Sequence, residues 1–375
     1  MASIVAPVPH GSVQVPMGQP AVLPPAASRI ISLDVFRGLT MILLISHAFG
    51  LLEVLKGNTS FLASQFDHAA WVGCTLWDLI QPAFTFIVGA AMPFAIRRRQ
   101  QEGQTTAQVF GHVVWRAVLL ILLSNVLSNW NSSGPPRLQL INVLCQIALG
   151  YVVCFLVLQL RFRWQVVIGA SLLAFHQLLF FIFPGPEGPF DPTANVGAVL
   201  DQQLLGYNYS GYYTTLNFLG NAITIVFGAW TGILLASTRS HGERLRILSL
   251  CAAAAFASGL LLSLWIPMVK RLWTVSFTLY STGWILVGLL AIYWIVEMRG
   301  WKRWAFPAIV VGTNCIFIYA FSQVLRGWLS RGLGNFTGHF WFLGTWGELP
   351  HNLLVFAVMW YLCFWLYQRR IFFKI

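Results

Sequence analysis

Apolar residues run along most of the chain in long stretches, separated by short polar or charged segments. Ten of these stretches come close to the roughly 20 residues that a helix needs to cross a bilayer. They lie at residues 38–55, 76–96, 112–130, 140–160, 164–183, 216–236, 247–267, 274–297, 305–325 and 350–368. A helix satisfies every backbone polar group within its own segment, which hydrocarbon requires. The pattern therefore predicts an all-α membrane protein, a polytopic bundle of about ten transmembrane helices.

Basic residues are unevenly divided between the two sides that this bundle would present. Of the 23 Lys and Arg residues, 17 fall on one side. The other six are Lys56, Arg137, Lys270, Arg271, Arg326 and Arg331. Cytoplasmic loops of membrane proteins carry an excess of Lys and Arg, so the side with 17 is expected to face the cytoplasm. This predicts cytoplasmic N- and C-termini and places His68 on the outer side.

The composition agrees with a membrane protein and excludes several other classes. Hydrophobic residues make up 57% of the chain and charged residues 9%, where a soluble domain carries about 25% charge. The formal charge of +12 comes from short clusters between apolar runs, so no basic face for nucleic acid is expected. The six cysteines are scattered without a C-x-x-C spacing, which argues against a disulfide framework or a metal site.

The N-terminal segment differs from the rest of the chain. Residues 1–28 are rich in Pro, Ala and Val and contain no Lys or Arg. A signal peptide needs a basic start and a continuous apolar core, and the prolines interrupt any such core. We predict a disordered cytoplasmic tail at 1–28, followed by a transmembrane domain at 29–375.

Two long connections fall on the predicted outer side, at residues 184–215 and 326–349. The first is rich in Pro and the second in Gly and Trp. Neither is long enough for a separate domain, and long loops inside compact domains are usually functional. We expect both to form an ordered rim over an outward-facing cavity.

A cluster of polar residues marks the entrance to the second predicted helix. His68 and Asp78 flank the aromatic turn that contains Trp71, and Gln81 follows on the same helical face as Asp78. Ionisable groups at a membrane helix are costly, which makes them functional candidates. His68 is the candidate general base, oriented by either Asp78 or Asp67. The alternative is an ordinary interfacial belt of His and Trp residues.

The first predicted helix carries a second polar set. Asp34 and Arg37 are three residues apart, so they share a helix face and can pair. Asp34 is therefore either a catalytic candidate or a helix cap at the membrane edge. Ser46 and His47 interrupt an apolar run, and they either line the same cavity as His68 or bond to neighbouring helices.

Other polar side chains lie within or beside the predicted helices. Amides that could orient a polar substrate are Asn142, Gln146, Asn217 and Asn314. Each could instead serve as a packing hydrogen bond between helices. The run from Arg97 through Arg98 to Arg99 ends the second helix on the inner side. It is either a membrane anchor or a binding site for an anionic cytosolic cofactor, because Arg matches phosphate oxygens bidentately.

Several of these motifs together resemble one known family. They are SLDVFRGLT at 32–40, HAAWVGCTLWDLIQPAFTFIVGAAM at 68–92, LNFLGNAITIVFGAWTGILL at 216–235, KRLWTVSFTLYSTGWILVGLLAIYWIVE at 270–297, FPAIVVGTNCIFIYAFSQV at 306–324 and YQRRIFFKI at 367–375. They resemble the lysosomal heparan-α-glucosaminide N-acetyltransferase family and its bacterial relatives. The resemblance extends over nearly the whole predicted membrane region.

The resemblance implies transfer of an acetyl group from cytosolic acetyl-coenzyme A to a glycan-type acceptor across the membrane. It assigns the catalytic histidine to His68 and the motif acidic and basic residues to Asp34, Arg37 and Asp78. The sequence departs from the family pattern at ISHAFG, where the lysosomal enzyme has an active-site asparagine, and at Cys145-Gln146-Ile147. It leaves open a sugar amine, a sugar hydroxyl or a lipid-linked glycan as acceptor.

The resemblance also implies the bacterial cytoplasmic (inner) membrane as location and a homodimer as one expected state. His68 would act as general base for direct transfer or would itself carry the acetyl group. The alternative from another class is a secondary transporter or flippase with a polar cavity between helices, although no internal repeat is visible. A structural membrane scaffold is the third hypothesis, and it leaves His68, Asp34 and Asp78 without a role.

Overall fold

The computed structural model describes residues 30–55, 60–130, 134–208 and 213–373. Within these ranges the chain is helical, and its single β-bridge joins Gly185 to Gly188. The predicted all-α class is therefore confirmed. The tail predicted at residues 1–28 lies outside the described residues.

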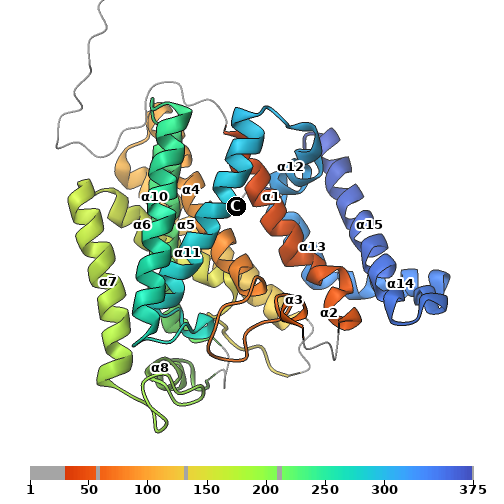
Figure 1. The fold of residues 1–375 in the computed structure, drawn as a ribbon, viewed down its shortest axis with the longest axis horizontal. Coiled ribbons are helices and arrows are strands. Elements are labelled where there is room, and N and C mark those ends of the chain that lie inside the picture. The colour runs from red at the N-terminus through yellow and green to blue at the C-terminus, as the bar shows by residue number, and fades with distance from the viewer. Residues whose placement is uncertain (1–29, 56–59, 131–133, 209–212, 374–375) are drawn as a thin grey trace, which may run out of the picture.

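The bundle is built from helices that match the predicted stretches one by one (Figure 1). They are α1 (Ile31–Ser46), α4 (Ile80–Gln101), α5 (Thr106–Asn129), α6 (Val143–Leu158), α7 (Phe162–Ile182), α9 (Phe218–Ala236), α10 (His241–Ser263), α11 (Val275–Tyr293), α12 (Phe306–Thr313) with α13 (Cys315–Val324), and α15 (Glu348–Gln368). Within the described ranges, eight helical segments are long and apolar enough to cross a membrane. The chain is thus a multi-pass integral membrane protein.

Two of the ten predicted spans differ from expectation. The stretch 140–160 yields α6, whose 16 residues are fewer than the roughly 20 of a full span, because its helix starts only after the Asn142 cap. The stretch 305–325 is not one helix: α12 and α13 meet at Asn314 with a bend of 71°. Counting this bent pair as one span gives nine.

The last described residues of the chain pack against the bend at Asn314. The Asn314 side-chain amide donates to the Ile371 carbonyl at 3.1 Å and its oxygen accepts from the Phe373 N–H at 3.0 Å. The Phe373 ring also stacks on Phe317 at 5.3 Å. The C-terminal segment thus satisfies the polar side chain that lies at the bend, as a polar group in an apolar segment requires.

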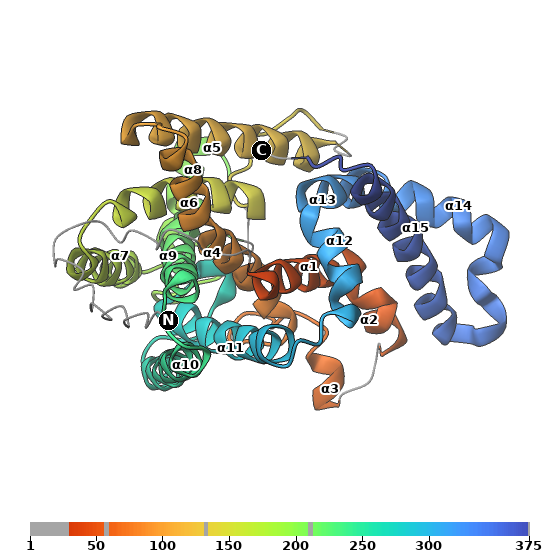
Figure 2. The same cartoon turned by 90° about the horizontal axis from the view of Figure 1, so that it is seen from above.

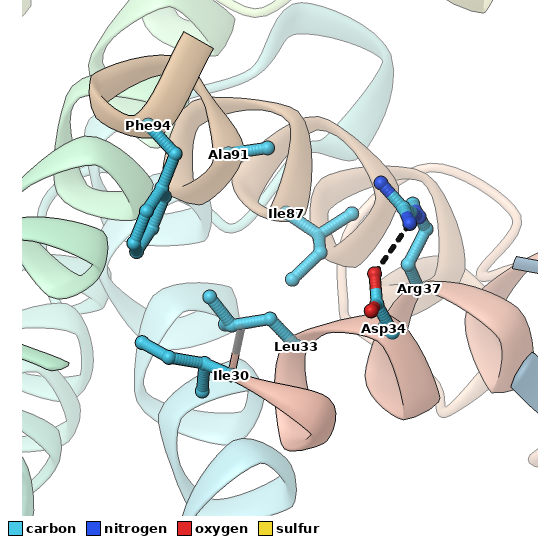
Figure 3. Close-up of a pocket in the computed structure, with 7 residues that line it drawn as sticks. All are labelled: Ile30, Leu33, Asp34, Arg37, Ile87, Ala91 and Phe94. Carbon is cyan, nitrogen blue, oxygen red and sulfur yellow. Dashed lines mark hydrogen bonds and ion pairs between the residues drawn. The ribbon is translucent and has the colours of Figure 1, made fainter. Parts of the chain in front are cut away.

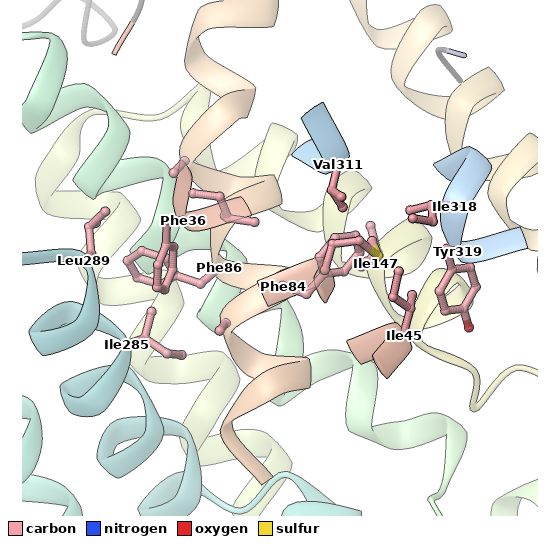
Figure 4. Packing of buried hydrophobic residues seen from close by; sticks show 14 of the residues in the cluster. Phe36, Ile45, Phe84, Phe86, Ile147, Ile285, Leu289, Val311, Ile318 and Tyr319 are labelled. Atoms are coloured by element: carbon pink, nitrogen blue, oxygen red, sulfur yellow. The ribbon is translucent and has the colours of Figure 1, made fainter. Parts of the chain in front are cut away.

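Helix α4 lies near the centre of the bundle and contacts α1, α6, α9 and α11 (Figure 2). Its contact with α9 depends on glycines, because a Cβ on Gly89 would lie 1.9 Å from the Ile225 carbonyl oxygen and one on Gly228 1.9 Å from that of Phe86. Small residues allow membrane helices to approach this closely. Large apolar side chains from α1, α4, α6, α11, α12 and α13 fill the interior beside this contact (Figure 4).

Each of the two long connections contains a helix among its described residues. The first contains α8 (Val196–Leu205), and the second contains α14 (Arg326–Thr337) followed by a distorted helical segment, Gly338–Gly347. Both lie toward the lower edge of Figure 1, whereas α1 begins and α15 ends toward its upper edge. The start of α1 and the end of α15 therefore share one side of the bundle. That this side is cytoplasmic stays a prediction.

Candidate active site

The turn before α4 is wrapped around one carboxylate. Asp78 lies in the short 3-10 helix Trp77–Leu79 that leads into α4, and it is 1% exposed. Its Oδ2 accepts hydrogen bonds from the Ala69 N–H, the Thr75 N–H and the Thr75 hydroxyl, each at 3.1 Å. A buried carboxylate is costly unless such donors satisfy it. The loop between residues 69 and 75 therefore encloses a charged acceptor.

His68 contacts the other oxygen of the same carboxylate. Its Nδ1 lies 2.7 Å from Asp78 Oδ1. An ionised carboxylate only accepts, so this short contact assigns the proton to Nδ1 and leaves Nε2 as the basic nitrogen. The His68 side chain is 47% exposed, and no described residue bonds to Nε2. Asp67 instead accepts from the His68 backbone N–H at 2.7 Å, so Asp78 is the carboxylate that contacts the ring.

A third charged residue joins the pair from a distant part of the chain. Lys270 opens the short 3-10 helix Lys270–Leu272, and its side chain is 8% exposed. Its Nζ lies 3.3 Å from Asp78 Oδ1 and 3.3 Å from His68 Nδ1. Lys270 thus gives the buried Asp78 carboxylate a cationic partner in addition to the imidazole. The sequence interpretation missed this lysine, although its motif KRLW belongs to the resemblance.

The turn that carries Lys270 is held by contacts from α9. The Asn217 amide donates to the Arg271 carbonyl, and the Trp273 indole donates to Thr224 at 3.1 Å. Trp273 adopts a φ of 54°, a left-handed conformation that is rare for a bulky residue and requires support from its surroundings. Asn217, predicted to bind substrate, is fully buried and instead positions the backbone next to Lys270.

Cys74 lies in the same loop but is unsuited to act as a nucleophile. Burial, together with the nearby Asp78 carboxylate, raises the pKa of its thiol to about 12. The thiolate is the nucleophilic form of cysteine, and it is therefore suppressed at neutral pH. Among the side chains of this loop, the imidazole of His68 is the available base.

The other predicted residues near this end have varied positions. The Trp71 indole donates to the Phe190 carbonyl at 2.9 Å, which ties the turn to the first long connection. Gln81 is half-buried in the first turn of α4. Ser46 is buried and bonds back to the Leu43 carbonyl of its own helix. His47 is exposed beyond the end of α1 with a φ of 48°. Neither Ser46 nor His47 makes a polar contact with His68 in the described residues.

The remaining amides have packing partners. Asn142 caps α6 by accepting from the Leu144 N–H at 3.1 Å and also accepts from the Tyr319 hydroxyl at 3.3 Å. Gln146 is fully buried and donates to the Leu140 carbonyl at 3.1 Å. Asn314 holds the C-terminal segment, as described above. These contacts favour the packing interpretation over the substrate-binding one for Asn142 and Asn314.

Asp34 and Arg37 form the predicted pair, but far from His68. Arg37 Nη2 lies 2.6 Å from Asp34 Oδ1, and both line a cavity of about 230 Å³ between α1 and α4 (Figure 3). The α4 residues of this cavity begin at Ile87, roughly 13 Å along the helix axis from Asp78 at 1.5 Å per residue. The structure therefore does not bring Asp34 to His68, because the two lie toward opposite ends of α4.

The three predicted cofactor-binding arginines of α4 lie at the same end as this cavity. Arg98 pairs with Glu102 at 3.0 Å, and Arg99 contacts Gln104 at 3.4 Å. One buried guanidinium nitrogen of Arg97 has no hydrogen-bond partner among the described residues. No group of three or more metal-ligating side chains occurs in the part of the chain that the structure describes.

The fold and the site together define a polytopic helical membrane protein with a histidine, a carboxylate and a lysine in contact at one end of the bundle, and basic residues at the other. A family model described as a domain of unknown function (DUF5009) matches residues 29–193. Two curated relatives match nearly the whole chain. The human heparan-alpha-glucosaminide N-acetyltransferase is 24% identical over 97% of this chain, and the mouse protein of the same name is 25% identical over 95%.

The chain spans about three fifths of the length of these relatives, 62% in each case. The resemblance expected from the sequence motifs is thus confirmed, and it covers both His68 and Lys270.

Proposed function

We propose that this protein is a membrane-embedded acetyltransferase that moves an acetyl group from cytosolic acetyl-coenzyme A to a glycan-type acceptor on the outer side. The observation that carries the proposal is the contact of His68 with Asp78 and Lys270 at the predicted outer end of α4. The similarity to two N-acetyltransferases supports the same class of reaction.

In the direct mechanism, His68 Nε2 takes the proton from the amine or hydroxyl of the acceptor. The acceptor then attacks the thioester carbonyl, a new bond to the acetyl carbon forms, and the carbon–sulfur bond breaks. The leaving thiolate of coenzyme A takes the proton from Nε2. Asp78 stabilises the imidazolium that forms in between and keeps the ring in its tautomer, as the third member of a triad does. In the alternative, Nε2 attacks the thioester carbonyl, the carbon–sulfur bond breaks and coenzyme A leaves as the thiolate. The acceptor then attacks the acetyl carbon, the bond from this carbon to Nε2 breaks, and the acceptor proton goes to the thiolate.

The donor would enter from the arginine-rich end of α4. Coenzyme A carries phosphates that cannot cross hydrocarbon, so its nucleotide would stay beside Arg97, Arg98 and Arg99 at the inner face. Its thin pantetheine arm would run past the cavity at Asp34 and Arg37 toward His68. In this arrangement Asp34 helps to bind the donor and takes no part in proton transfer.

The remaining assignments follow from the same proposal. The positive-inside charge pattern supports cytoplasmic termini, and the bacterial inner membrane is the location that the resemblance implies. The acceptor belongs to the amino-sugar or glycan class, and Trp71 in the turn after His68 and Gln81 in the first turn of α4 are its proposed contacts. A homodimer is proposed from the resemblance alone.

A second candidate function is secondary transport. The bend of 71° between α12 and α13 favours it, because transporters often bind substrate where a transmembrane helix is broken. This function predicts accumulation of a substrate without consumption of an acyl donor.

The test reconstitutes the full chain in liposomes, with acetyl-coenzyme A on one side and glucosamine as the amine probe. We expect release of free coenzyme A that depends on glucosamine, and a loss of about 10² to 10⁴-fold in rate for His68→Gln. His339→Gln, which removes a histidine of the second long connection, is the control and should retain the rate. Glucosamine uptake without coenzyme A release would reject the enzyme in favour of the transporter.

A further inference from the structure

A second basic cavity opens on another face of α4. It has a volume of about 140 Å³ and lies between the last turns of α4, the first half of α5 and Tyr151 of α6. Its polar lining consists of Arg99, His112, Arg116 and Tyr151. At 100° per residue, the α4 residues of this cavity point about a third of a turn away from those of the Asp34 cavity. The two cavities are therefore separate.

The guanidinium of Arg116 is held in place but is not neutralised. Its Nη1 donates to the Tyr151 hydroxyl at 3.2 Å, and its carbon lies 4.8 Å from the centre of the Tyr151 ring. Its Nε is buried without a hydrogen-bond partner among the described residues. No Asp or Glu lines the cavity, and the nearby Glu102 pairs with Arg98. An oriented guanidinium with an unfilled donor is suited to an anion, and phosphate matches it well.

The surroundings of the cavity are those of a lipid site. Trp115 stands at its rim and is 60% exposed, as is typical of tryptophans at head-group level. Val118 and Leu122 continue the exposed apolar face of α5 toward the membrane interior. A volume of 140 Å³ is below the roughly 300 Å³ of the smallest ordinary ligand pockets, so it accommodates a head group and not a whole cofactor.

The geometry points to a binding site for the phosphate group of an anionic phospholipid, formed by Arg99, Arg116 and Tyr151. The phosphate accepts from the two guanidinium groups, and the acyl chains lie along Trp115 and Leu122. Basic pockets between transmembrane helices on the cytoplasmic side bind anionic head groups in this way. The phosphates of coenzyme A have the same chemistry, so the experiment must separate the two sources.

The experiment measures ligand retention and melting temperature of the purified full chain in detergent. The probes are phosphatidylglycerol, phosphatidylcholine with the same acyl chains, coenzyme A, and pantetheine, which lacks phosphate. We expect phosphatidylglycerol to be retained in native mass spectrometry and to raise the melting temperature, and phosphatidylcholine to do neither. Arg116→Gln and Arg99→Gln should each weaken retention about tenfold, the equivalent of one charge-assisted hydrogen bond.

Arg163→Gln, which removes an exposed arginine at the start of α7, is the matched control. Arg99→Gln keeps the inference testable if Arg116→Gln fails to fold, because Arg99 makes only a 3.4 Å contact with Gln104. Stabilisation by coenzyme A and not by pantetheine, lost in the same two variants, would support the phosphate site and identify the cofactor as its source. Retention of phosphatidylglycerol that is unchanged in both variants would overturn the inference. His68→Gln should leave the retention of phosphatidylglycerol unchanged. The test of this site therefore does not depend on whether the protein is an acetyltransferase.

Discussion

The two ends of α4 differ in how far their buried charged groups are satisfied by hydrogen bonds and ion pairs. At its start, Asp78 is enclosed and receives donors from Ala69, Thr75, His68 and Lys270. At its far end, buried guanidinium nitrogens of Arg97 and Arg116 lack hydrogen-bond partners among the described residues. A closed network holds a fixed geometry, whereas unfilled donors are available to an incoming anion. The difference supports the proposal of proton transfer at one end and of binding of phosphorylated ligands at the other.

The largest effect is expected from Asp78→Asn. The amide oxygen would take the place of Oδ2, which receives donors from Ala69 and Thr75, so the amide NH2 would face His68 Nδ1. A donor at that place favours the proton on Nε2, so Nε2 would no longer be the free base. In a triad this kind of change lowers the rate by about 10⁴-fold, and we expect a loss of the same order in acetyl-coenzyme A turnover. Asp67→Asn is the control, because the Asp67 carboxylate bonds to the backbone N–H of His68 and not to its imidazole ring. A normal rate in Asp78→Asn would remove Asp78 from the mechanism.

The next effect is expected from Lys270→Met, which leaves the Asp78 charge without its ammonium partner. Breaking a buried ion pair from one side costs about 3 to 5 kcal/mol in unfolding free energy, and a lower melting temperature should report it. The double variant with Asp78→Asn tests the pairing. We expect the double variant to lose less stability than the sum of the two single losses; if the two losses simply add, the residues are not coupled.

A smaller effect is expected at the middle of α4, between the two ends. In Gly89→Ala the new methyl group would lie 1.9 Å from the Ile225 carbonyl oxygen, so α4 and α9 must separate. Overpacking of this kind costs about 1 to 3 kcal/mol. Gly111→Ala in α5 meets nothing within 4 Å and should leave the melting temperature equal or higher. Equal melting temperatures for both variants would contradict the close contact of the two helices.

The smallest effect is expected in the connection that covers the outer end. Backbone N–H groups of Thr193 and Ala194 bond to Asp191 and hold the pKa of its carboxyl at about 2, below the ordinary value of 3.8. Since the folded pKa is depressed, the stabilisation is complete above pH 4 and is lost as the pH falls toward 2. The protection factors of residues 187–194, that is, their hydrogen-exchange rates corrected for intrinsic exchange at each pH, should fall in that window in the wild type. In Asp191→Asn these protection factors should already be lower at pH 7 and nearly independent of pH between 4 and 2.

Some of the site could be predicted because its geometry is local. Asp34 and Arg37 are three residues apart on one helix, and the structure pairs them at 2.6 Å. His68 and Asp78 are ten residues apart, so the sequence could propose them as a pair, but it could not choose between Asp78 and Asp67 as the partner of His68. Lys270 is 202 residues from His68, and no spacing rule connects residues so far apart. Its membership of the site depends on how α9 and α11 pack beside α4.

The amide side chains show the same limit to what the sequence can predict. For Asn217 and Asn314 the sequence left open a role in orienting a substrate and a packing hydrogen bond. In the structure Asn217 supports the turn of Lys270 and Asn314 binds the C-terminal backbone. A polar residue in an apolar helix needs a partner, which is a rule about its chemistry. Which partner it finds depends on the segment that packs against it. The break between α12 and α13 escaped prediction for the same reason.

The sequence by itself determined that this is an all-α membrane protein, where its apolar segments fall, and that His68, Asp78, Asp34 and Arg37 are its candidate residues. These properties follow from hydrophobic length, charge bias and helical spacing, which act along the chain. Only the tertiary structure decided that Asp34 is remote from His68, that Lys270 contacts Asp78 and His68, and that two separate cavities, one lined by the Asp34–Arg37 pair and one by Arg99 and Arg116, lie beside α4. Those outcomes depend on contacts between distant segments, because glycine-mediated packing brings side chains together regardless of their order in the sequence.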